Sequence, residues 1–502
     1  SVNQIAVQSR SAPQWNPEKG MWEWWYWGYY RVPPHGPYAS TEKKVNCYAA
    51  SSDGIQWDTP DLGLHEWQGS RHNNVTHDPE ARTYTLSLEQ QCPPTPGQPD
   101  KQPFVIPVAA GLVGRDGAPL PLRLAADGEA VSETLLVLDA PSASWTFHGV
   151  DAEPVPSLLR GFSAPVLLDD GLADADLLVL LAHDPDPFNR WEAGQRLALQ
   201  RMQRALAAHA LPQLDEPYVE AMREVLRHPR LAPAFKELVL SLPAEAYVAQ
   251  TLPAVDPPRL QAVREAMRAQ LAARLHADWV WAWEQHPVHE GYRPDAAQAG
   301  RRALANLALA MLCLHASEVG DPLWPGRAYQ RVKDATNMTD RLGALRALLH
   351  AHATLAQPAL ERFHAMFRTE PLALDKWFAL QAGTPERGGA TFERVRALLA
   401  HPDFTLANPN RARSLLHMFC LHNAAALHRS DADGVRLWAE RVLELDARNP
   451  QLAARLARAL DRWAQLAEPY RAQARQAVER VAAPPQLSND VREVVTRALE
   501  PA

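Results

Sequence analysis

The stretch RWEAGQRLALQRMQRALAAHA, residues 190–210, decides the fold of most of this chain. Its apolar residues recur at i, i+3 and i+4, which is the spacing of one face of an α-helix. The stretch GRRALANLALAMLCLHA, residues 300–316, repeats that pattern, and Ala/Leu/Arg-rich segments continue to the C-terminus. Asn408-Pro409 and Asn449-Pro450 each offer an N-cap followed by proline at the first helical position. Short links between these segments predict antiparallel helix pairs stacked as a large all-α solenoid over residues 186–502.

The region before the solenoid, residues 78–185, has the pattern of short strands separated by turns. Six or seven strands at this spacing predict a β-sandwich of the Ig-like kind. The candidate strands are TYTLSLEQ (83–90), PFVIPVAAGLVG (103–114), PLPLRLA (119–125), ETLLVLDA (133–140), SWTFHGV (144–150), FSAPVLLD (162–169) and DLLVLLAHD (176–184).

Residues 1–77 are rich in aromatic residues and turns, and MWEWWYWGYYRV at 21–32 predicts one or two strands. The rings of residues 21–30 either fill a β core or stack on a sugar or a base. The core is favoured because successive residues of a strand alternate between its two faces. The fold class predicted for the whole chain is therefore multidomain β + α: a short β-rich segment, a β-sandwich and an all-α solenoid.

Composition excludes several classes of function. Over 502 residues, 51 basic residues stand against 58 acidic ones, and a net charge of −7 argues against nucleic-acid binding. No apolar run approaches the roughly 18 residues of a membrane span, and no signal peptide is visible at the start. The four cysteines, Cys47, Cys92, Cys313 and Cys420, lie far apart, which is typical of a reducing compartment and predicts a cytoplasmic location.

Catalytic motifs are absent from the sequence. A zinc peptidase needs H-E-x-x-H, but His65-Glu66 and His289-Glu290 lack the second histidine. Nucleophile-elbow and phosphate-loop motifs are absent too. No catalytic residue and no metal ligand is therefore predicted.

One cluster has residue types that bind metals. His417, Cys420 and His422 lie on one apolar helix, where His417 and Cys420 share a face and His422 lies off it. An ordinary half-buried helix face is favoured over a metal site there.

Seven long stretches, in order along the chain, carry a resemblance to the C-terminal half of bacterial aminopeptidase N. They are DPEARTYTLSLEQQCPPTPGQPDKQPFVIPVAAGLVGRDG (78–117), PVPSLLRGFSAPV (154–166), HDPDPFNRWEA (183–193), NMTDRLGAL (337–345), LDKWFALQA (374–382), FTLANPNRARSLL (404–416) and LDARNPQLAARL (445–456).

The resemblance implies a zinc aminopeptidase that removes N-terminal amino acids from peptides. The family has four parts: an N-terminal β domain, a thermolysin-like catalytic domain, a small β-sandwich and a helical domain. This chain resembles the last two. The family's Gly-Ala-Met-Glu-Asn strand and its H-E-x-x-H helix have no counterpart in these 502 residues. We therefore expect no cofactor in this chain, although the intact family uses zinc, and we expect no activity from this chain alone.

The resemblance also implies a peptide-binding site. In the relatives, two loop–helix starts of the helical domain face the cavity over the catalytic cleft, and the matching positions here are Arg413, Gln451 and Arg455. Arginine offers planar donors for carbonyls or a carboxylate, and helix N-termini also favour anions. The alternative is that Arg413 and Arg455 tie helices together. Peptides or peptide N-termini are the expected partners, with the missing catalytic half or a second copy as further ones.

Residues 48–74, YAASSDGIQWDTPDLGLHEWQGSRHNN, resemble about one blade of a five-bladed β-propeller of the glycoside-hydrolase kind. One blade cannot close a propeller, so Asp53 and Asp58 are interpreted as turn residues. The join near His77-Asp78 has no linker, which indicates a truncated or rearranged coding sequence or an assembly join. Two alternative functions stay open: a peptide-binding scaffold and a carbohydrate-active fusion.

Overall fold

The structure is a computed structural model in which the chain divides into two compact units, Ser1–Gly194 and Gln195–Ala502. The described residues are 4–9, 14–16, 21–31, 42–51, 77–78, 81–95 and 97–500, with side chains from residue 81 onward. The turn residues Asp53 and Asp58 and most of the propeller-like segment lie outside this range.

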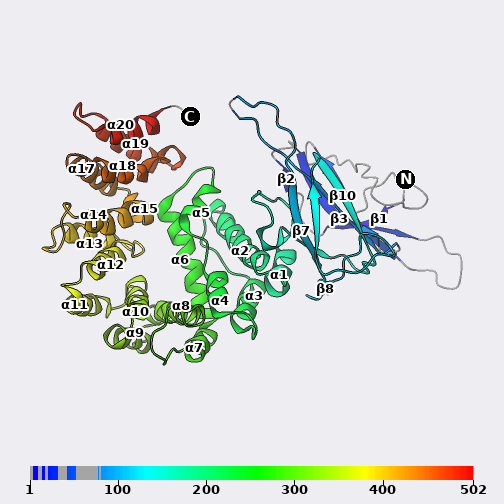
Figure 1. Cartoon of the computed structure of the whole chain (residues 1–502), viewed down its shortest axis with the longest axis horizontal. Helices are drawn as coiled ribbons and strands as arrows, with labels where there is room; N and C mark the ends of the chain where they lie inside the picture. The colour runs from blue at the N-terminus through cyan, green and yellow to red at the C-terminus, as the bar shows by residue number, and fades with distance from the viewer. Residues whose placement is uncertain are drawn as a thin grey trace. The chain divides into compact units, whose positions relative to one another are not determined.

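The first strands of the N-terminal unit form an antiparallel sheet (Figure 1). The central strand β3 pairs with β1, β2 and β4, and Trp25 lies opposite Tyr48. Residues 21–31 of the aromatic run are thus confirmed as strand. The bounds are β1 Gln4–Ser9, β2 Gln14–Asn16, β3 Met21–Arg31 and β4 Glu42–Ser51.

Two further sheets follow in the same unit and form the predicted β-sandwich. One sheet has the order β10-β6-β5, and in the other β7 pairs with β11, β8 and β9. Both are antiparallel throughout. The strands are β5 His77–Asp78, β6 Thr83–Glu89, β7 Ile106–Val113, β8 Pro119–Leu120, β9 Thr134–Leu138, β10 Ser142–His148 and β11 Val155–Leu158.

The inner faces of the two sheets share one apolar core. Leu86 and Phe147 come from the first sheet, and Val108, Leu112 and Leu136 come from the second; all are buried. In β9 the burial alternates residue by residue, as period two requires of a strand with one face on a core.

Gly111 on β7 makes room for a buried arginine. A Cβ atom at Gly111 would lie 1.9 Å from Cζ of Arg160. Arg160 donates from Nε to Ser157 Oγ at 2.8 Å, and its Nη2 lies 3.6 Å from Asp184 Oδ1. The absence of a side chain at 111 therefore lets the guanidinium lie directly on the sheet.

Two predicted strands are wrong. Residues 162–169 hold no strand, and residues 176–184 belong mostly to the helix α1, Asp174–His183. A short apolar run such as LLVLL suits a buried strand and a buried helix equally well. The Asp176 carboxylate accepts from the Ala173 backbone amide at 3.2 Å, which fixes the start of α1 as a helix.

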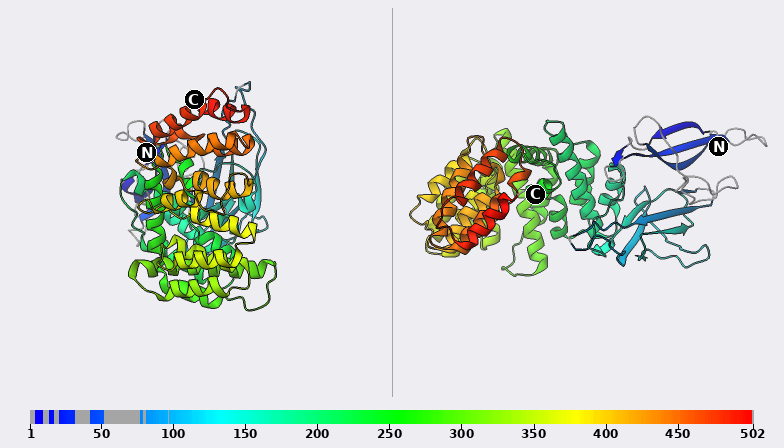
Figure 2. Two further views of the ribbon diagram at one scale, coloured as in Figure 1. Left: turned by 90° about the vertical axis from the view of Figure 1, so that its left-hand side faces the viewer. Right: turned by 90° about the horizontal axis from the view of Figure 1, so that it is seen from above.

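The second unit is helical, and its helices follow one another in chain order from green to red (Figures 1 and 2). The bounds are α2 Pro187–Ala207 (across the division), α3 Glu216–Arg227, α4 Pro233–Leu240, α5 Glu245–Gln250, α6 Pro257–Arg274, α7 His276–Gln285, α8 Ala296–Val319, α9 Leu323–Asp334, α10 Met338–His350, α11 Ala356–Phe367, α12 Pro371–Ala382, α13 Ala390–Leu399, α14 Pro409–Ala412, α15 Met418–His422, α16 Ala424–Leu427, α17 Asp433–Asp446, α18 Pro450–Ala457, α19 Tyr470–Ala482 and α20 Asn489–Leu499. The predicted all-α solenoid is confirmed. The domain bounds 1–77, 78–185 and 186–502 stay predictions.

Large rings fill the interior of this helical unit. Trp279, Trp438, Phe363, Phe378 and Phe419 are each less than 2% exposed. Trp438 Nε1 donates to the Leu456 carbonyl at 2.9 Å, so that its polar atom is satisfied while the ring is buried.

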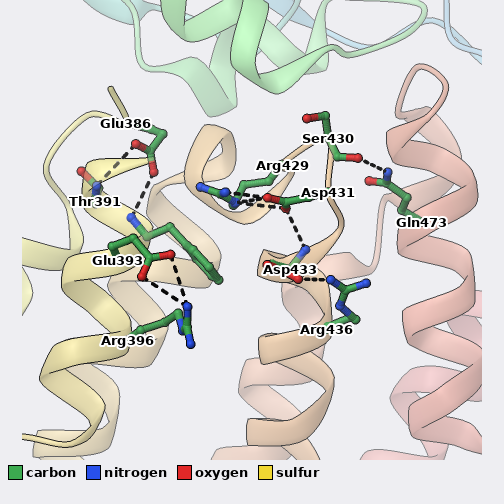
Figure 3. Close-up of polar contacts among 11 residues, drawn as sticks. Glu386, Thr391, Glu393, Arg396, Arg429, Ser430, Asp431, Asp433, Arg436 and Gln473 are labelled. Carbon is green, nitrogen blue, oxygen red and sulfur yellow. Dashed lines mark hydrogen bonds and ion pairs between the residues drawn. The ribbon is translucent and has the colours of Figure 1, made fainter. Parts of the chain in front are cut away.

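Polar contacts hold the starts of α13 and α17 in place (Figure 3). The Glu386 carboxylate accepts from the backbone amides of Thr391 and Phe392 at 3.4 and 3.0 Å, and so caps the start of α13. Asp431 does the same for the Asp433 amide at 3.0 Å at the start of α17. These contacts satisfy donors that a helix start leaves free.

No helix among the residues described here is both long enough and apolar enough to cross a membrane.

Candidate functional site

A cavity of about 520 Å³ lies between α12 on one side and the chain from α14 to α15 on the other. These helices are the yellow and orange ones of Figure 1. The lining mixes cationic, amide, imidazole and apolar groups, which suits a ligand with both polar and apolar parts. The lining residues are Leu372, Asp375, Lys376, Ala379, Asn410, Arg413, Ser414, His417, Met418 and His422.

One wall of this cavity begins at the predicted helix start. Asn408 Oδ1 accepts from the backbone amides of Asn410 and Arg411 at 3.0 and 3.2 Å, and Pro409 occupies the first helical position. The N-cap is thus confirmed. The chain then winds as a π-helical turn over Arg413–His417 before α15 begins. Such turns are rare and often occur at functional sites.

Arg411 lies behind the cavity and is fixed there. Its Nε donates to Asp375 Oδ1 at 2.6 Å, and its Nη1 donates to the Asp403 carbonyl. The guanidinium also stacks 5.0 Å from the centroid of the Phe378 ring. Only 7% of the Arg411 side chain is exposed. This arginine is therefore part of the packing between α12 and α14.

Arg413, two residues later, lines the cavity instead and is exposed. Within the described part of the chain, no side chain or backbone group forms a hydrogen bond or ion pair with its guanidinium. The same holds for Lys376 across the cavity. The acidic lining residue Asp375 is engaged by Arg411. The cavity therefore presents cationic donors without a matching anion, an arrangement that suits carbonyl or carboxylate oxygens.

The pKa of His417, which lines the cavity, reports the positive charge around it. Burial lowers the pKa of His417 to about 4, with further lowering by the charges of Arg413, Arg455 and then His422; the Leu452 backbone acts in the opposite sense. Its Nε2 is buried and has no hydrogen-bond partner in the described residues. At neutral pH the imidazole is therefore uncharged, beside two cations.

The structure brings two of the three predicted site residues together. Arg413 lines the cavity, and Arg455 lies close enough to act on the same His417. Gln451 is exposed in the first turn of α18, one turn before Arg455, and does not line the cavity. The start of α18 is capped as predicted, since Asn449 Oδ1 accepts from the Leu452 amide at 3.0 Å. The peptide-binding role of these residues stays a prediction.

The predicted faces of the His417, Cys420 and His422 helix are wrong. His417 and His422 line the same cavity, whereas Cys420 is 4% exposed and lies in the core. The prediction assumed that the helix continues past His422. His422 is instead the last residue of α15, and the chain leaves the helix at Asn423.

Sequence reasoning missed a second cluster, formed by His364, His401 and Asp403. One ligand atom from each lies within 4.8 Å of the other two, and among the described residues this is the group with metal-ligand chemistry. His364 lies 39 residues away from Asp403, so spacing along the chain gave no sign of it. Lys376 and Asn410 were missed as well, although both belong to stretches that carry the family resemblance.

Two family models match the chain. Residues 72–171 match a domain of unknown function with an Ig-like fold (DUF3458), and residues 174–500 match its companion of ARM repeats (DUF3458_C). These matches agree with the β-sandwich and the helical solenoid described above.

Curated relatives carry the name aminopeptidase N. The one from Escherichia coli is 34% identical over 84% of this chain and 48% of its own length; the one from Caulobacter vibrioides is 38% identical over 75% and 43%. The chain thus spans about half the length of the curated relatives it matches. A crystal structure of Legionella pneumophila aminopeptidase A in complex with aspartic acid has the same fold over 86% of this chain and 49% of that one, with a TM-score of 0.71 at 24% identity.

Proposed function

This chain belongs to the aminopeptidase family that carries the DUF3458 Ig-like and ARM-repeat domains, and from that premise we propose that it supplies the peptide-binding part of an aminopeptidase. The cavity beside α12 receives a stretch of peptide, and Arg413 donates to its carbonyl oxygens or terminal carboxylate. Arg455 adds positive charge at the same place, and Gln451 extends the polar surface along α18.

The observation that carries this proposal is the contrast at Arg413. An arginine that tied helices together would have acceptors within reach, as Arg411 has in Asp375 and Asp403. Arg413 has none among the described residues and lines a cavity of peptide-accommodating size. Free, planar donors on a concave apolar surface are what recognition of a peptide backbone requires.

The hydrolytic step is proposed to lie outside these residues. In the family, zinc polarises the scissile carbonyl and activates water. The donor set found here does not fit that role. His364, His401 and Asp403 come from a helix and a turn, and no glutamate stands among them as a base. Neither these residues nor the sequence provides the H-E-x-x-H arrangement, so we derive no catalytic step for this chain.

We therefore propose the catalytic half of an aminopeptidase as the partner of this chain. The cytoplasm is the proposed compartment, because Cys92, Cys313 and Cys420 are free thiols. A peptide-binding scaffold without turnover is the second candidate, and the same free Arg413 favours it.

Peptide binding tests the proposal directly. Isothermal titration of the full chain with tetra-alanine, in the presence of a chelator, should show saturable binding. Arg413→Ala should weaken that binding about tenfold or more, because a hydrogen bond to a charged group contributes about 1.5–3 kcal/mol. Arg396→Ala is the matched control, since Arg396 is exposed and pairs with Glu393 away from the cavity. Equal binding by Arg413→Ala and the unchanged chain would refute the proposed site.

Two further measurements divide the alternatives. A C-terminally amidated tetra-alanine should bind as well as the free acid if Arg413 recognises carbonyls, and more weakly if it recognises the carboxylate. Hydrolysis of alanyl- and leucyl-4-nitroanilide by the purified chain should not occur. Turnover that survives repurification would show that the 502 residues contain a catalytic site. It would overturn the proposal that the hydrolytic step lies outside these residues.

A further inference from the structure

We propose that His364, His401 and Asp403 form a zinc-binding site that joins α11 to the turn before α14. Two imidazoles and one carboxylate are the ligand types that zinc takes from proteins. The site is separate from the peptide cavity, since none of the three residues lines it, and it does not depend on the proposed function.

The ligand atoms already face one another. His364 Nε2 lies 2.6 Å from Asp403 Oδ2, and His401 Nδ1 lies 3.8 Å from the same oxygen. Ligand atoms about 2.0–2.2 Å from a shared zinc ion stand roughly 3–3.5 Å apart in a tetrahedral site. Side-chain adjustments of less than about an ångström would therefore place all three around one ion.

The surroundings hold the two imidazoles in place. Trp377 contacts both rings, with centroids 5.1 Å from His364 and 5.3 Å from His401. Trp377 is itself fixed, because its Nε1 donates to the Leu360 carbonyl at 3.1 Å. Phe378 contacts His401 from another direction at 5.8 Å. Rings oriented in this way lose little freedom when a metal ion binds.

The protons and lone pairs are compatible with a metal. The Asp403 amide donates to His401 Nδ1 at 3.1 Å, so Nδ1 carries a lone pair and binding costs that one hydrogen bond. A zinc ion would take the Nε2 lone pair of the His364 tautomer that carries its one proton on Nδ1, so the contact between Nε2 and the Asp403 carboxylate would be replaced by a bond from each to the ion.

Charge and access also permit the ion. The nearby Arg411 is paired with Asp375, and the Asp403 carboxylate, whose neighbours in the cluster are the two imidazoles, supplies negative charge to the ion. The side chains of His364 and His401 are each 26% exposed and that of Asp403 is 37% exposed. Water can therefore reach the ion and complete four-coordination.

Zinc titration of the full chain tests this inference. After chelator treatment and buffer exchange, competition with a chromophoric zinc chelator should give one tight site per chain. His364→Ala and His401→Ala should each weaken that site about tenfold or more, and Asp403→Asn should also weaken it. The matched control is His289→Ala, which removes an exposed histidine outside the cluster and should leave affinity unchanged.

A spectroscopic measurement on the unchanged chain covers the case in which a variant fails to fold. X-ray absorption of the zinc-loaded protein should show two imidazole ligands with oxygen in the remaining positions. Three results would each overturn the site: no stoichiometric zinc binding, unchanged affinity in both histidine variants, or an absorption spectrum without histidine ligands.

Discussion

Arg411 and Arg413 leave the same short segment of chain and end in opposite environments. Arg411 is 7% exposed and binds Asp375, the Asp403 carbonyl and the face of Phe378. Arg413 is exposed on the cavity and has no partner in the described residues. The residue type is the same and the two positions are only two residues apart, at the end of α14 and the start of the π turn, so the difference lies in what the neighbouring helix α12 offers to each. Arg411 serves the fold, and Arg413 is left for a ligand.

The largest expected difference between the two arginines is in the free energy of unfolding when each is replaced by alanine. Arg411→Ala leaves the Asp375 carboxylate, 15% exposed, without its partner, and should lower the free energy of unfolding by about 3 kcal/mol. Arg413→Ala should change it by less than about 0.5 kcal/mol. Urea unfolding followed by tryptophan fluorescence measures both. Equal losses in the two variants would break the comparison.

A second change sharpens the result at Arg411. Asp375→Asn in the Arg411→Ala background removes the buried charge, so it should recover part of the lost stability. If it recovers none, the loss comes from the Phe378 stacking and the Asp403 carbonyl instead.

Two histidines extend the comparison to electrostatics. The pKa of His417, beside the cavity, is lowered to about 4 by burial and by Arg413 and Arg455, while burial alone lowers that of His428 to about 4 in the core. Arg455→Gln should therefore raise the pKa of His417 and leave that of His428 unchanged. Bound peptide carboxylate should act in the same direction as Arg455→Gln. NMR titration of the two imidazoles is the measurement, and a parallel rise at His428 would contradict the assignment.

The same two groups give the stability a defined dependence on pH. Both histidines have a lower pKa in the folded chain than the usual value of 6.5, so the unfolded chain binds more protons between about pH 4 and 6.5. The free energy of unfolding should fall as the pH is lowered through that window. His428→Gln should flatten the fall. If the free energy of unfolding of the variant falls with pH as steeply as that of the unchanged chain, the pH dependence comes from other groups.

The smallest expected effect concerns the geometry of the hydrogen-bond donors at position 413. Arg413→Lys keeps the positive charge and loses the planar pair of donors. Peptide affinity should fall by roughly threefold, less than in Arg413→Ala, if two donors act together. Titration calorimetry with tetra-alanine distinguishes the two variants. Full affinity in the lysine variant would show that charge alone is recognised.

Much of the fold could be predicted from local pattern. The N-caps at Asn408 and Asn449 were predicted correctly. An N-cap side chain accepts from a backbone amide only two or three residues further along the chain, so the signal is local. The strand predicted over 176–184 failed since an apolar run of five does not distinguish helix from strand. The local signal that favours the helix is the Asp176 carboxylate, which accepts from the Ala173 backbone amide at the helix start.

The candidate site was predictable only where a resemblance marked it. Arg413 was named from the family pattern, and no local rule separates it from Arg411. The partner of Arg411 lies 36 residues earlier on α12, and the metal-ligand cluster unites residues 39 apart. Contacts at such separations depend on how helices stack, which periodicity and capping do not specify.

The π turn at Arg413–His417 has a consequence for how this chain tolerates insertions and deletions. A π turn holds one residue more than the α-helical turn it replaces. Deleting one residue there would restore a regular helix and leave the residues on either side nearly in place, whereas a deletion from a regular α-helix turns everything after it by about 100°. Cys420 would then stay in the core. A single-residue deletion is therefore expected to be tolerated at this turn more readily than within the regular helices of the chain.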